Sequence, residues 1–564
     1  MAEIIIMPKL GFNMDEGQLV KWHRRVGETV KKGEVLFEIN TDKTTMPVEA
    51  TADGTVLQLM LEEGAFAEVF TPIAVIGAPG EDPNAVLNGP ATPQAAPAAP
   101  AEPAGYDYDV VVIGAGPGGY ETAIKAAQCG KKTCIIEGAG FGGTCLNVGC
   151  IPTKALIQTA DVYHKVKDAA RFAVTGVEAD KIAVDMAALQ ARKKAVVKTL
   201  VNGVKGLLRG NKVTVVEGMA SFADTHTLSV DGRSITGANI IIATGSSVFM
   251  PPFIALEGEN HLLTSTEALD LDQVPASVTV IGGGVIGVEF AYLLNRLGSK
   301  VTVLELMDHI LPMVDIEVSR LAEKRMTKDG ILFRLGAKVS RVKGDTVYYE
   351  YEGQECQVKS DMVFMAVGRV PNTQGLNAEG IGIEFDRKAI RTDAHMRTNI
   401  PHIYAIGDVN GKVMLAHTAS HEGMVAVADI CGQGEEMRYD RIPSCVYLEP
   451  EIACIGLTEA QAREKYGDGL KIGRFNMAAN GKSLIAGDTD GLFKVIVAAD
   501  TGEILGAHLY GQHVTDMIGE ISAAMAAEGT AEELIHAIHP HPTVNEALSE
   551  AFMAAWNGRA INSL

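Results

Sequence analysis

Two cysteines in a glycine-rich segment form the strongest chemical signal in the chain. Cys145 and Cys150 lie within residues 142–154, which read Gly-Gly-Thr-Cys-Leu-Asn-Val-Gly-Cys-Ile-Pro-Thr-Lys. The segment leads into an expected helix, whose positive end would lower the pKa of a thiol and favour the attacking thiolate. Eight cysteines in 564 residues are too few for a disulfide-stapled fold. The pair therefore predicts a redox-active disulfide.

The other cysteines offer a control for this interpretation. Cys129 and Cys134 have the same spacing but fall at an expected helix end and inside an expected strand, so we interpret both as small, buried, apolar residues. The remaining four form no C-x-x-C motif, and His417 with His421 lacks a third ligand pattern, so no metal site is expected. These four are Cys356, Cys431, Cys445 and Cys454.

A histidine and a glutamate near the C-terminus could supply acid–base chemistry. Residues 539–546 read His-Pro-His-Pro-Thr-Val-Asn-Glu. Exchange between a disulfide and a dithiol needs a base to accept a thiol proton, and imidazole titrates in the useful range when a carboxylate orients it. His539 and His541 are the candidate bases, and Glu546 is the candidate carboxylate. A proline-rich loop with surface histidines is the alternative.

A repeated glycine pattern predicts the elements that position this chemistry. Residues 110–137 match a second segment at an offset of 168 residues, and each copy reads as an apolar strand, a glycine-rich turn, an amphipathic helix and a second strand. Two βαβ nucleotide-binding folds are therefore expected. The matched positions are Gly114 and Gly282, Gly116 and Gly284, Gly119 and Gly287, Gly130 and Gly298, and Glu137 and Glu305.

Each glycine in this pattern has a physical role. The first permits a tight turn, the second lets the backbone approach a pyrophosphate, and the third lets the helix pack on the strand. Glu137 and Glu305 end their strands where a carboxylate can bind a ribose diol. No arginine follows Glu305 to meet a 2′-phosphate, so NAD is favoured over NADP.

The remaining organisation is simpler. Residues 1–78 read as a small all-β module whose halves repeat weakly at 37 residues, with Leu36 matching Ile73 and Ile39 matching Ile76. Residues 79–104 hold seven prolines and eight alanines and predict an extended linker. The net charge of −21 argues against nucleic-acid and membrane partners, and a soluble cytoplasmic protein is expected.

Residues 105–564 resemble the flavin-dependent pyridine nucleotide–disulfide oxidoreductases, and the cysteine segment resembles the signature of members that oxidise dihydrolipoamide. The resemblance implies FAD in the first unit, NAD in the second, Cys145 as the thiol that meets substrate and Cys150 as the thiol beside the flavin. Lys154 would lie near the flavin ring. Further implied cofactor contacts come from the Ala-Thr-Gly motif ending at Gly245 and from Asp408 in Ala-Ile-Gly-Asp.

The same resemblance implies how the C-terminal residues act. The family motif His-Pro-Thr, with a glutamate five residues after the histidine, maps to His541 and Glu546. In the family this base reaches the cysteines of the other subunit, so a homodimer is implied.

Residues 1–78 resemble lipoyl domains, with Asp42-Lys43 at the place of the lipoylated lysine. The Met-Lys-Met of biotinyl domains is missing there, so lipoate on Lys43 is favoured. Implied partners are the lipoylated acyltransferase and decarboxylase components of a 2-oxoacid or acetoin dehydrogenase complex, or a glycine cleavage system. A tethered carrier would raise the effective concentration of the substrate.

We therefore expect dihydrolipoyl oxidation coupled to NAD⁺ reduction. The alternatives are a mercuric or glutathione reductase type of enzyme, or a lipoyl carrier or scaffold subunit. The expected fold class is α/β, with two Rossmann-like domains and an α+β dimerisation domain after an all-β lipoyl domain. The expected domains are 1–78 lipoyl, 79–104 linker, 105–250 FAD-binding, 251–373 NAD-binding, 374–440 central, and 441–564 dimerisation.

Overall fold

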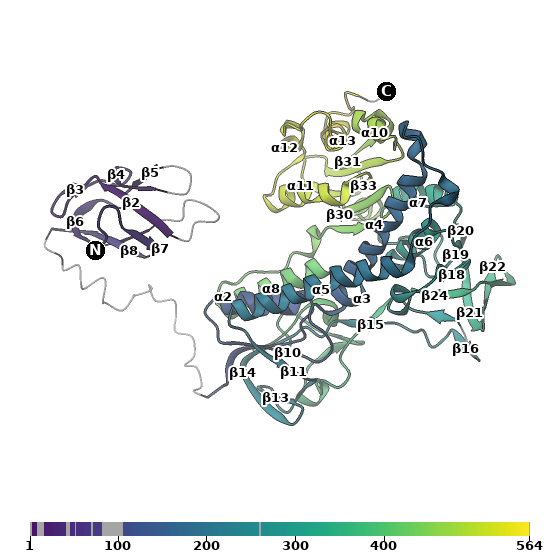
Figure 1. The fold of residues 1–564 in the computed structure, drawn as a ribbon, viewed down its shortest axis with the longest axis horizontal. Coiled ribbons are helices and arrows are strands. Elements are labelled where there is room, and N and C mark those ends of the chain that lie inside the picture. The colour runs from purple at the N-terminus through teal and green to yellow at the C-terminus, as the bar shows by residue number, and fades with distance from the viewer. Residues whose placement is uncertain are drawn as a thin grey trace. The chain divides into compact units, whose positions relative to one another are not determined.

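The chain divides into two compact units, residues 1–104 and 105–564. A computed structural model describes residues 3–7, 16–40, 45–50, 52–68, 71–79, 81, 105–258 and 261–562 (Figure 1). In that part of the chain, no helix is long and apolar enough to cross a membrane. All but two residues of the expected linker lie outside the described residues.

The N-terminal unit consists of two four-stranded antiparallel sheets. Leu36, Ile39, Ile73 and Ile76 are all buried in the core between them, so the weak sequence repeat reflects two equivalent β-halves. The first sheet has the order β1 (Glu3–Ile6), β8 (Pro72–Gly77), β6 (Gly54–Leu59), β3 (Thr29–Val30), and the second has the order β5 (Thr45–Glu49), β4 (Val35–Asn40), β2 (Glu16–Trp22), β7 (Phe66–Glu68).

The first βαβ module of the larger unit holds a parallel sheet. Its strand order is β11 (Thr214–Glu217), β10 (Thr133–Glu137), β9 (Tyr108–Ile113), β14 (Arg233–Ile242). Strand β14 also pairs in parallel with the late strand β28 (Ile403–Ala405) and antiparallel with β13 (Thr227–Val230), which in turn pairs with β12 (Ala220–Phe222). Its helices are α2 (Pro117–Gln128), α3 (Gly143–Val148), α4 (Cys150–Lys167), α5 (Met186–Gly210) and α8 (Ala416–Ile430). Valines and isoleucines of β9 and β14 are fully buried, as expected for a parallel sheet covered on both faces.

The second βαβ module repeats this plan. Its parallel sheet has the order β17 (Leu262–Leu263), β24 (Met362–Met365), β18 (Ser277–Ile281), β19 (Lys300–Glu305), β20 (Leu332–Leu335), with helices α6 (Val285–Leu297) and α7 (Ile316–Lys328). A second sheet holds β16 (Ala255–Glu257), β21 (Lys338–Lys343), β22 (Thr346–Tyr351) and β23 (Gln354–Lys359). Two small antiparallel pairs lie outside these sheets: β15 (Ser246–Val248) with β25 (Arg369–Pro371), and β26 (Phe385–Asp386) with β27 (Ala389–Ile390), which packs against the core of the first βαβ module.

The C-terminal module is an antiparallel sheet with helices on both faces. Its strand order is β29 (Ser444–Val446), β30 (Glu451–Gly456), β33 (Ile504–Gly511), β32 (Leu492–Ala498), β31 (Leu470–Asn476). The core between sheet and helices is formed with α11 (Val514–Ala526), α12 (Ala531–His536) and α13 (Glu546–Trp556), while α9 (Glu459–Tyr466) and α10 (Gly481–Ala486) complete the module. The predicted fold class is confirmed.

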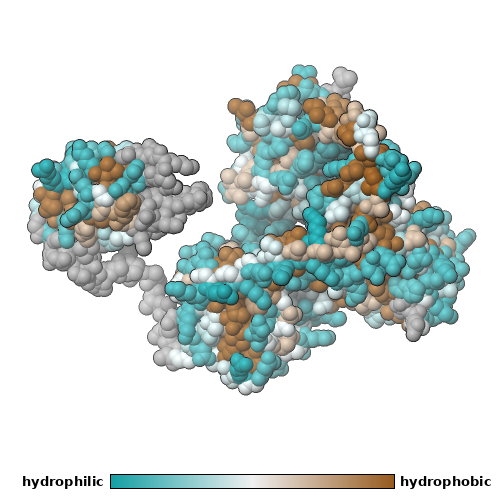
Figure 2. Space-filling view, viewed as in Figure 1, coloured by the Kyte–Doolittle hydropathy of each residue, from teal (hydrophilic) through white to brown (hydrophobic). Residues whose placement is uncertain are grey.

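The surface of the C-terminal module is partly apolar (Figure 2). Leu484 and Ile485 on α10 are exposed, and Ile538, just before the histidine segment, is 97% exposed.

Candidate active site

A cavity of about 2260 Å³ in the larger unit is lined by residues of both βαβ modules. Parallel sheets bind ligands at the carboxyl ends of their strands, which is where both glycine turns lie. The predicted residues on the cavity wall are Gly114, Gly116, Gly119, Glu137, Cys145, Cys150, Lys154, Gly245, Gly282, Gly284, Glu305 and Asp408.

The two glycine turns have nearly the same geometry. Gly114 has φ +102° and Gly282 has φ +107°, a conformation that disfavours other residues. A Cβ atom at Gly119 would lie 1.9 Å from the Gly114 carbonyl oxygen, and one at Gly287 would lie 2.0 Å from the Gly282 oxygen. The third glycine of each motif is therefore required for the helix to start directly against the turn.

The middle glycines have a different reason to be small. Gly116 and Gly284 precede the first residues of α2 and α6 and line the cavity, and a Cβ atom at Gly284 would meet no atom within 4 Å. Neither helix start has a side-chain cap, so the N–H groups of the first turn remain available to an anion. Both cradles fit a dinucleotide pyrophosphate.

Glu137 and Glu305 end β10 and β19 on the cavity wall. Their carboxylates accept hydrogen bonds from the backbone of the glycine turn and of the residues that follow, which fixes their orientation. A carboxylate has about four acceptor positions, so each retains capacity for a ribose hydroxyl. The N–H donors are those of Ala115, Ala139 and Gly140 to Glu137, and of Gly283 and Met307 to Glu305.

The cysteine pair lies where two helices meet. Cys145 is in α3, and Cys150 is the first residue of α4. A hydrogen bond from the Cys145 thiol and the positive charge of Lys154 lower the pKa of Cys150 to about 7, against burial, which acts to raise it. Donating that hydrogen bond, together with burial, raises the pKa of Cys145. The two thiols are therefore chemically different, and Cys150 is the better thiolate and the better leaving group.

Lys154 is held by two residues that sequence reasoning missed. Its Nζ lies 2.6 Å from Oε2 of the buried Glu289 and 4.6 Å from the centre of the Tyr447 ring. The Tyr447 N–H donates to Glu289 Oε1 at 3.1 Å. Glu289 occupies the position that matches Glu121 in the glycine repeat, and that match was the available sequence signal.

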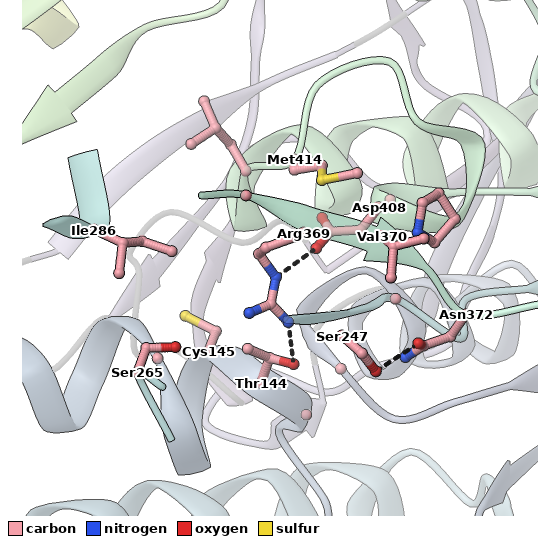
Figure 3. A pocket seen from close by; sticks show the side chains of 18 of the residues that line it. Thr144, Cys145, Ser247, Ser265, Ile286, Arg369, Val370, Asn372, Asp408 and Met414 are labelled. Carbon is pink, nitrogen blue, oxygen red and sulfur yellow. Dashed lines mark hydrogen bonds and ion pairs between the residues drawn. The ribbon is translucent and has the colours of Figure 1, made fainter. Parts of the chain in front are cut away.

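Arg369 is a third site residue that sequence reasoning missed. Figure 3 shows it between Asp408 and Thr144, with Cys145 beside it. The guanidinium donates to the hydroxyl and the carbonyl of Ser246, and the Ser246 hydroxyl donates to Asp408. Burial lowers the pKa of Arg369, although Asp408 and Cys150 act to raise it. Arg369 thus connects the predicted cofactor residue Asp408 to the α3 segment that carries the cysteines.

The predicted acid–base pair is formed as well. His541 Nδ1 lies 2.8 Å from Glu546 Oε1, and the Thr543 N–H donates to Glu546 Oε2 at 2.9 Å. Although burial acts to raise it, these two contacts hold the pKa of Glu546 below its usual value. The His541 side chain is 78% exposed and is not on the cavity wall.

His539 is in a different environment. Its side chain is only 8% exposed, and its Nε2 lies 2.8 Å from Oε1 of Glu520. The Asn545 amide donates to the other oxygen of the same carboxylate. His539 therefore anchors the histidine segment to α11, while His541 presents its second ring nitrogen outward.

One interpretation of the cysteines is wrong. Cys134 is buried in β10 as predicted, but Cys129 is exposed, because it lies just past the last turn of α2 rather than on its packed face. The described residues contain no group of three or more potential metal ligands. Lys43 lies outside the described residues, between the paired strand ends Asn40 and Thr45.

Two dinucleotide cradles that converge on a dithiol define a nucleotide-dependent disulfide oxidoreductase. Family models agree: Pyridine nucleotide-disulphide oxidoreductase matches residues 108–423, its dimerisation domain matches 442–552, and the biotin/lipoyl model, described as Biotin-requiring enzyme, matches 3–76. The chain belongs to the pyridine nucleotide–disulphide oxidoreductases. This family uses FAD and NAD, and the N-terminal match indicates lipoate.

Similar proteins are named dihydrolipoyl dehydrogenase. One from Bacillus subtilis (strain 168) is 41% identical over 451 residues, 79% of this chain and 98% of that protein. A mitochondrial one from Schizosaccharomyces pombe is 41% identical over 472 residues, 81% of this chain and 91% of that protein. The HOCl-induced flavoprotein disulfide reductase RclA from Escherichia coli has a TM-score of 0.70 at 31% identity, covering 79% of this chain and 99% of that one.

Proposed function

We propose that this chain is a dihydrolipoyl dehydrogenase, which oxidises protein-bound dihydrolipoyl groups and reduces NAD⁺ through the Cys145–Cys150 disulfide and FAD. The observation that carries the proposal is the dithiol itself: two cysteines with oppositely shifted pKa values on the wall of a cavity built from two dinucleotide turns. The names of the relatives support the choice of substrate.

In the proposed reaction, one thiolate of the substrate attacks Cys145 Sγ of the protein disulfide. The Cys145–Cys150 bond breaks, a mixed disulfide forms on Cys145, and Cys150 leaves as the thiolate that its lowered pKa favours. The second substrate sulfur then attacks the first, which closes the lipoyl disulfide and releases Cys145. The substrate has lost two electrons and two protons, and the protein has gained a dithiol.

Specific residues support each step of this reaction. His541, oriented by Glu546, accepts the substrate thiol proton. Lys154 stabilises the Cys150 thiolate, and Glu289 holds Lys154 in place. Bound FAD would supply the two-electron chemistry that links the dithiol to NAD⁺. Gly114, Gly116, Gly119, Glu137, Gly245 and Asp408 would hold FAD, and Gly282, Gly284, Gly287 and Glu305 would hold NAD.

We assign residues 105–250 to FAD binding, 251–373 to NAD binding, 374–440 to completing the FAD site and 441–564 to dimerisation. The pairing of β28 with β14 supports the third assignment, because it brings Asp408 to the first glycine turn. The dimerisation-domain match and the exposure of His541 support an active site in which His541 serves the dithiol of a second subunit.

A mixed dimer tests this arrangement. The test uses a dimer that pairs a Cys145→Ser subunit with a His541→Gln subunit. If each His541 serves the dithiol of the other subunit, one active site stays intact and about half the wild-type rate remains. Bases that act within one subunit leave no intact site and no activity. The single variants, as homodimers, should both be inactive in dihydrolipoamide oxidation while retaining FAD.

We further propose that residues 1–78 are a lipoyl domain with lipoate on Lys43. Strands β4 and β5 pair up to Asn40 and Thr45, which supports a short connection with Lys43 near its middle. The Ala/Pro-rich segment would tether the carrier near the dithiol, and the enzyme would serve the acyltransferase of a 2-oxoacid or acetoin dehydrogenase complex, or a glycine cleavage system.

Intact-protein mass spectrometry tests the attachment. Protein from lipoylation-competent cells should carry one lipoyl adduct that Lys43→Arg removes and that Lys32→Arg, a change at an exposed lysine of the same unit, retains. An unmodified wild-type protein would refute the carrier assignment but not the oxidoreductase assignment.

A further inference from the structure

Two helices of the first βαβ module run side by side and end at cysteines. Helices α2 and α8 pack in parallel: a Cβ atom at Gly118 would lie 2.9 Å from Ala419 Cβ, and one at Gly423 would lie 1.7 Å from Thr122 Oγ1 (Figure 1). Contacts advance along both helices in the same direction, so the glycines let the two backbones approach closely.

The two helix ends are nearly identical. Cys129 follows the last residue of α2 and Cys431 follows the last residue of α8, and the next residue in each case is a glycine with positive φ. Since the helices are parallel and similar in length, their C-terminal ends bring the two cysteines together.

Both thiols are accessible to solvent at the neighbouring helix ends. Cys129 is exposed, and Cys431 is partly exposed. Burial, followed by the neighbouring Cys129 thiol, raises the pKa of Cys431. Lys125 and Lys131 act in the opposite direction and favour the thiolate. The carboxyl end of a helix disfavours a thiolate, so exchange here should be slower than at Cys150, which begins a helix.

We propose that Cys129 and Cys431 form a second redox site, a surface dithiol that low-molecular-weight disulfides oxidise to a Cys129–Cys431 disulfide. The exposed Cys129 thiolate attacks the reagent disulfide and releases one reagent thiol. Cys431 then attacks the mixed disulfide and releases the second thiol, so two electrons and two protons pass from the protein to the reagent.

The new bond would clamp the flavin side of the cavity. Gly118 and Gly119 at the start of α2, and Ala416 and Ala419 at the start of α8, all line the cavity. A cross-link at the far ends of the same two helices should restrict their separation, and so oppose loss of the cofactor from between their N-termini.

Peptide mapping of the holoenzyme tests the site. The holoenzyme is incubated with oxidised glutathione, free thiols are alkylated, and the denatured protein is digested with trypsin without reduction. The expected product is peptide 126–131 joined to peptide 413–438, and dithiothreitol should separate them. Cys134, Cys145 and Cys150 all fall in peptide 133–154, so the catalytic disulfide cannot be mistaken for this product.

Matched variants test which cysteines form the cross-link. Cys129→Ser and Cys431→Ser should each abolish the joined peptides, and Cys356→Ser, which removes another partly exposed thiol on β23, should not. Recovery of Cys129 and Cys431 as separately alkylated or glutathionylated peptides from the wild-type holoenzyme would overturn the proposal.

A thermal measurement tests the clamp. Oxidation should raise the temperature at which the flavin is released, as followed by its fluorescence. The rise should be larger in the wild-type holoenzyme than in Cys129→Ser treated in the same way. Both proteins share the catalytic disulfide, so the difference reports the Cys129–Cys431 disulfide alone. Equal shifts in the two proteins would refute the clamp.

Discussion

The two histidine–glutamate pairs of the C-terminal segment allow a sharply controlled test of the acid–base assignment. His541–Glu546 and His539–Glu520 both have a nitrogen–oxygen distance of 2.8 Å, yet only the first histidine is exposed. We predict that Glu546→Gln slows the reaction of the enzyme with dihydrolipoamide and that Glu520→Gln has much less effect on it.

The expected magnitude follows from the contact that is lost. A hydrogen bond to a charged group contributes about 1.5–3 kcal/mol. Because the side chain of His541 is 78% exposed and that of Glu546 is 30% exposed, the lower end applies, and the rate should fall about 10-fold. Glutamine keeps the size of the side chain but not the charge that steadies a protonated imidazole.

Rapid mixing separates the two half-reactions. The dithiol half-reaction, followed after mixing with dihydrolipoamide, should slow in Glu546→Gln. Reduction of the flavin by NADH needs no thiol base and should keep the wild-type rate. Equal slowing of both half-reactions, or equal slowing in the two glutamine variants, would refute the role of Glu546 as the residue that orients the base.

Three other predictions follow. Gly287→Ala should destabilise the second βαβ module, because the added Cβ would lie 2.0 Å from a backbone oxygen. Gly284→Ala should fold normally and raise the KM for NAD⁺. Normal NAD⁺ kinetics in Gly284→Ala would count against the pyrophosphate cradle. Lys494→Met should lower the free energy of unfolding by about 3–5 kcal/mol in a urea titration, because Asp315, 1% exposed, loses the buried lysine 2.8 Å away; an unchanged midpoint would contradict this. In the reduced protein, the thiolate absorbance of Cys150, identified as the part that Cys150→Ser removes, should grow as the pH rises through about 7. Lys154→Met should move this increase in absorbance to higher pH. An unchanged titration in Lys154→Met would show that Lys154 does not stabilise the thiolate.

Local pattern predicted most of the fold and much of the site. The glycine repeat indicated two βαβ units because tight turns and close helix–strand packing place strict demands on neighbouring residues, as Gly119 and Gly287 show. The cysteine pair could be placed at the start of a helix for the same reason, since helix signals are local. The recurrence of Leu36 and Ile39 at Ile73 and Ile76, 37 residues later, likewise indicated two β-halves.

Long-range contacts could not be predicted in this way. Glu289 and its repeat partner Glu121 occupy matching positions, but only Glu289 is buried against Lys154, and that difference comes from the packing of α6 against α4. Arg369 contacts Asp408 and Thr144 across large sequence separations. The sequence predicts that Cys129 is buried, because it falls at a helix end within the βαβ core pattern. In the structure it lies just past the last turn of α2 and is exposed.

The central claim is that Cys145 and Cys150 store an electron pair in addition to the flavin. Anaerobic titration of the holoenzyme with dithionite tests this claim most directly. We predict uptake of about four electrons per chain, two by the disulfide and two by the flavin, and about two in Cys145→Ser. Uptake of only about two electrons by the wild-type holoenzyme would contradict the account.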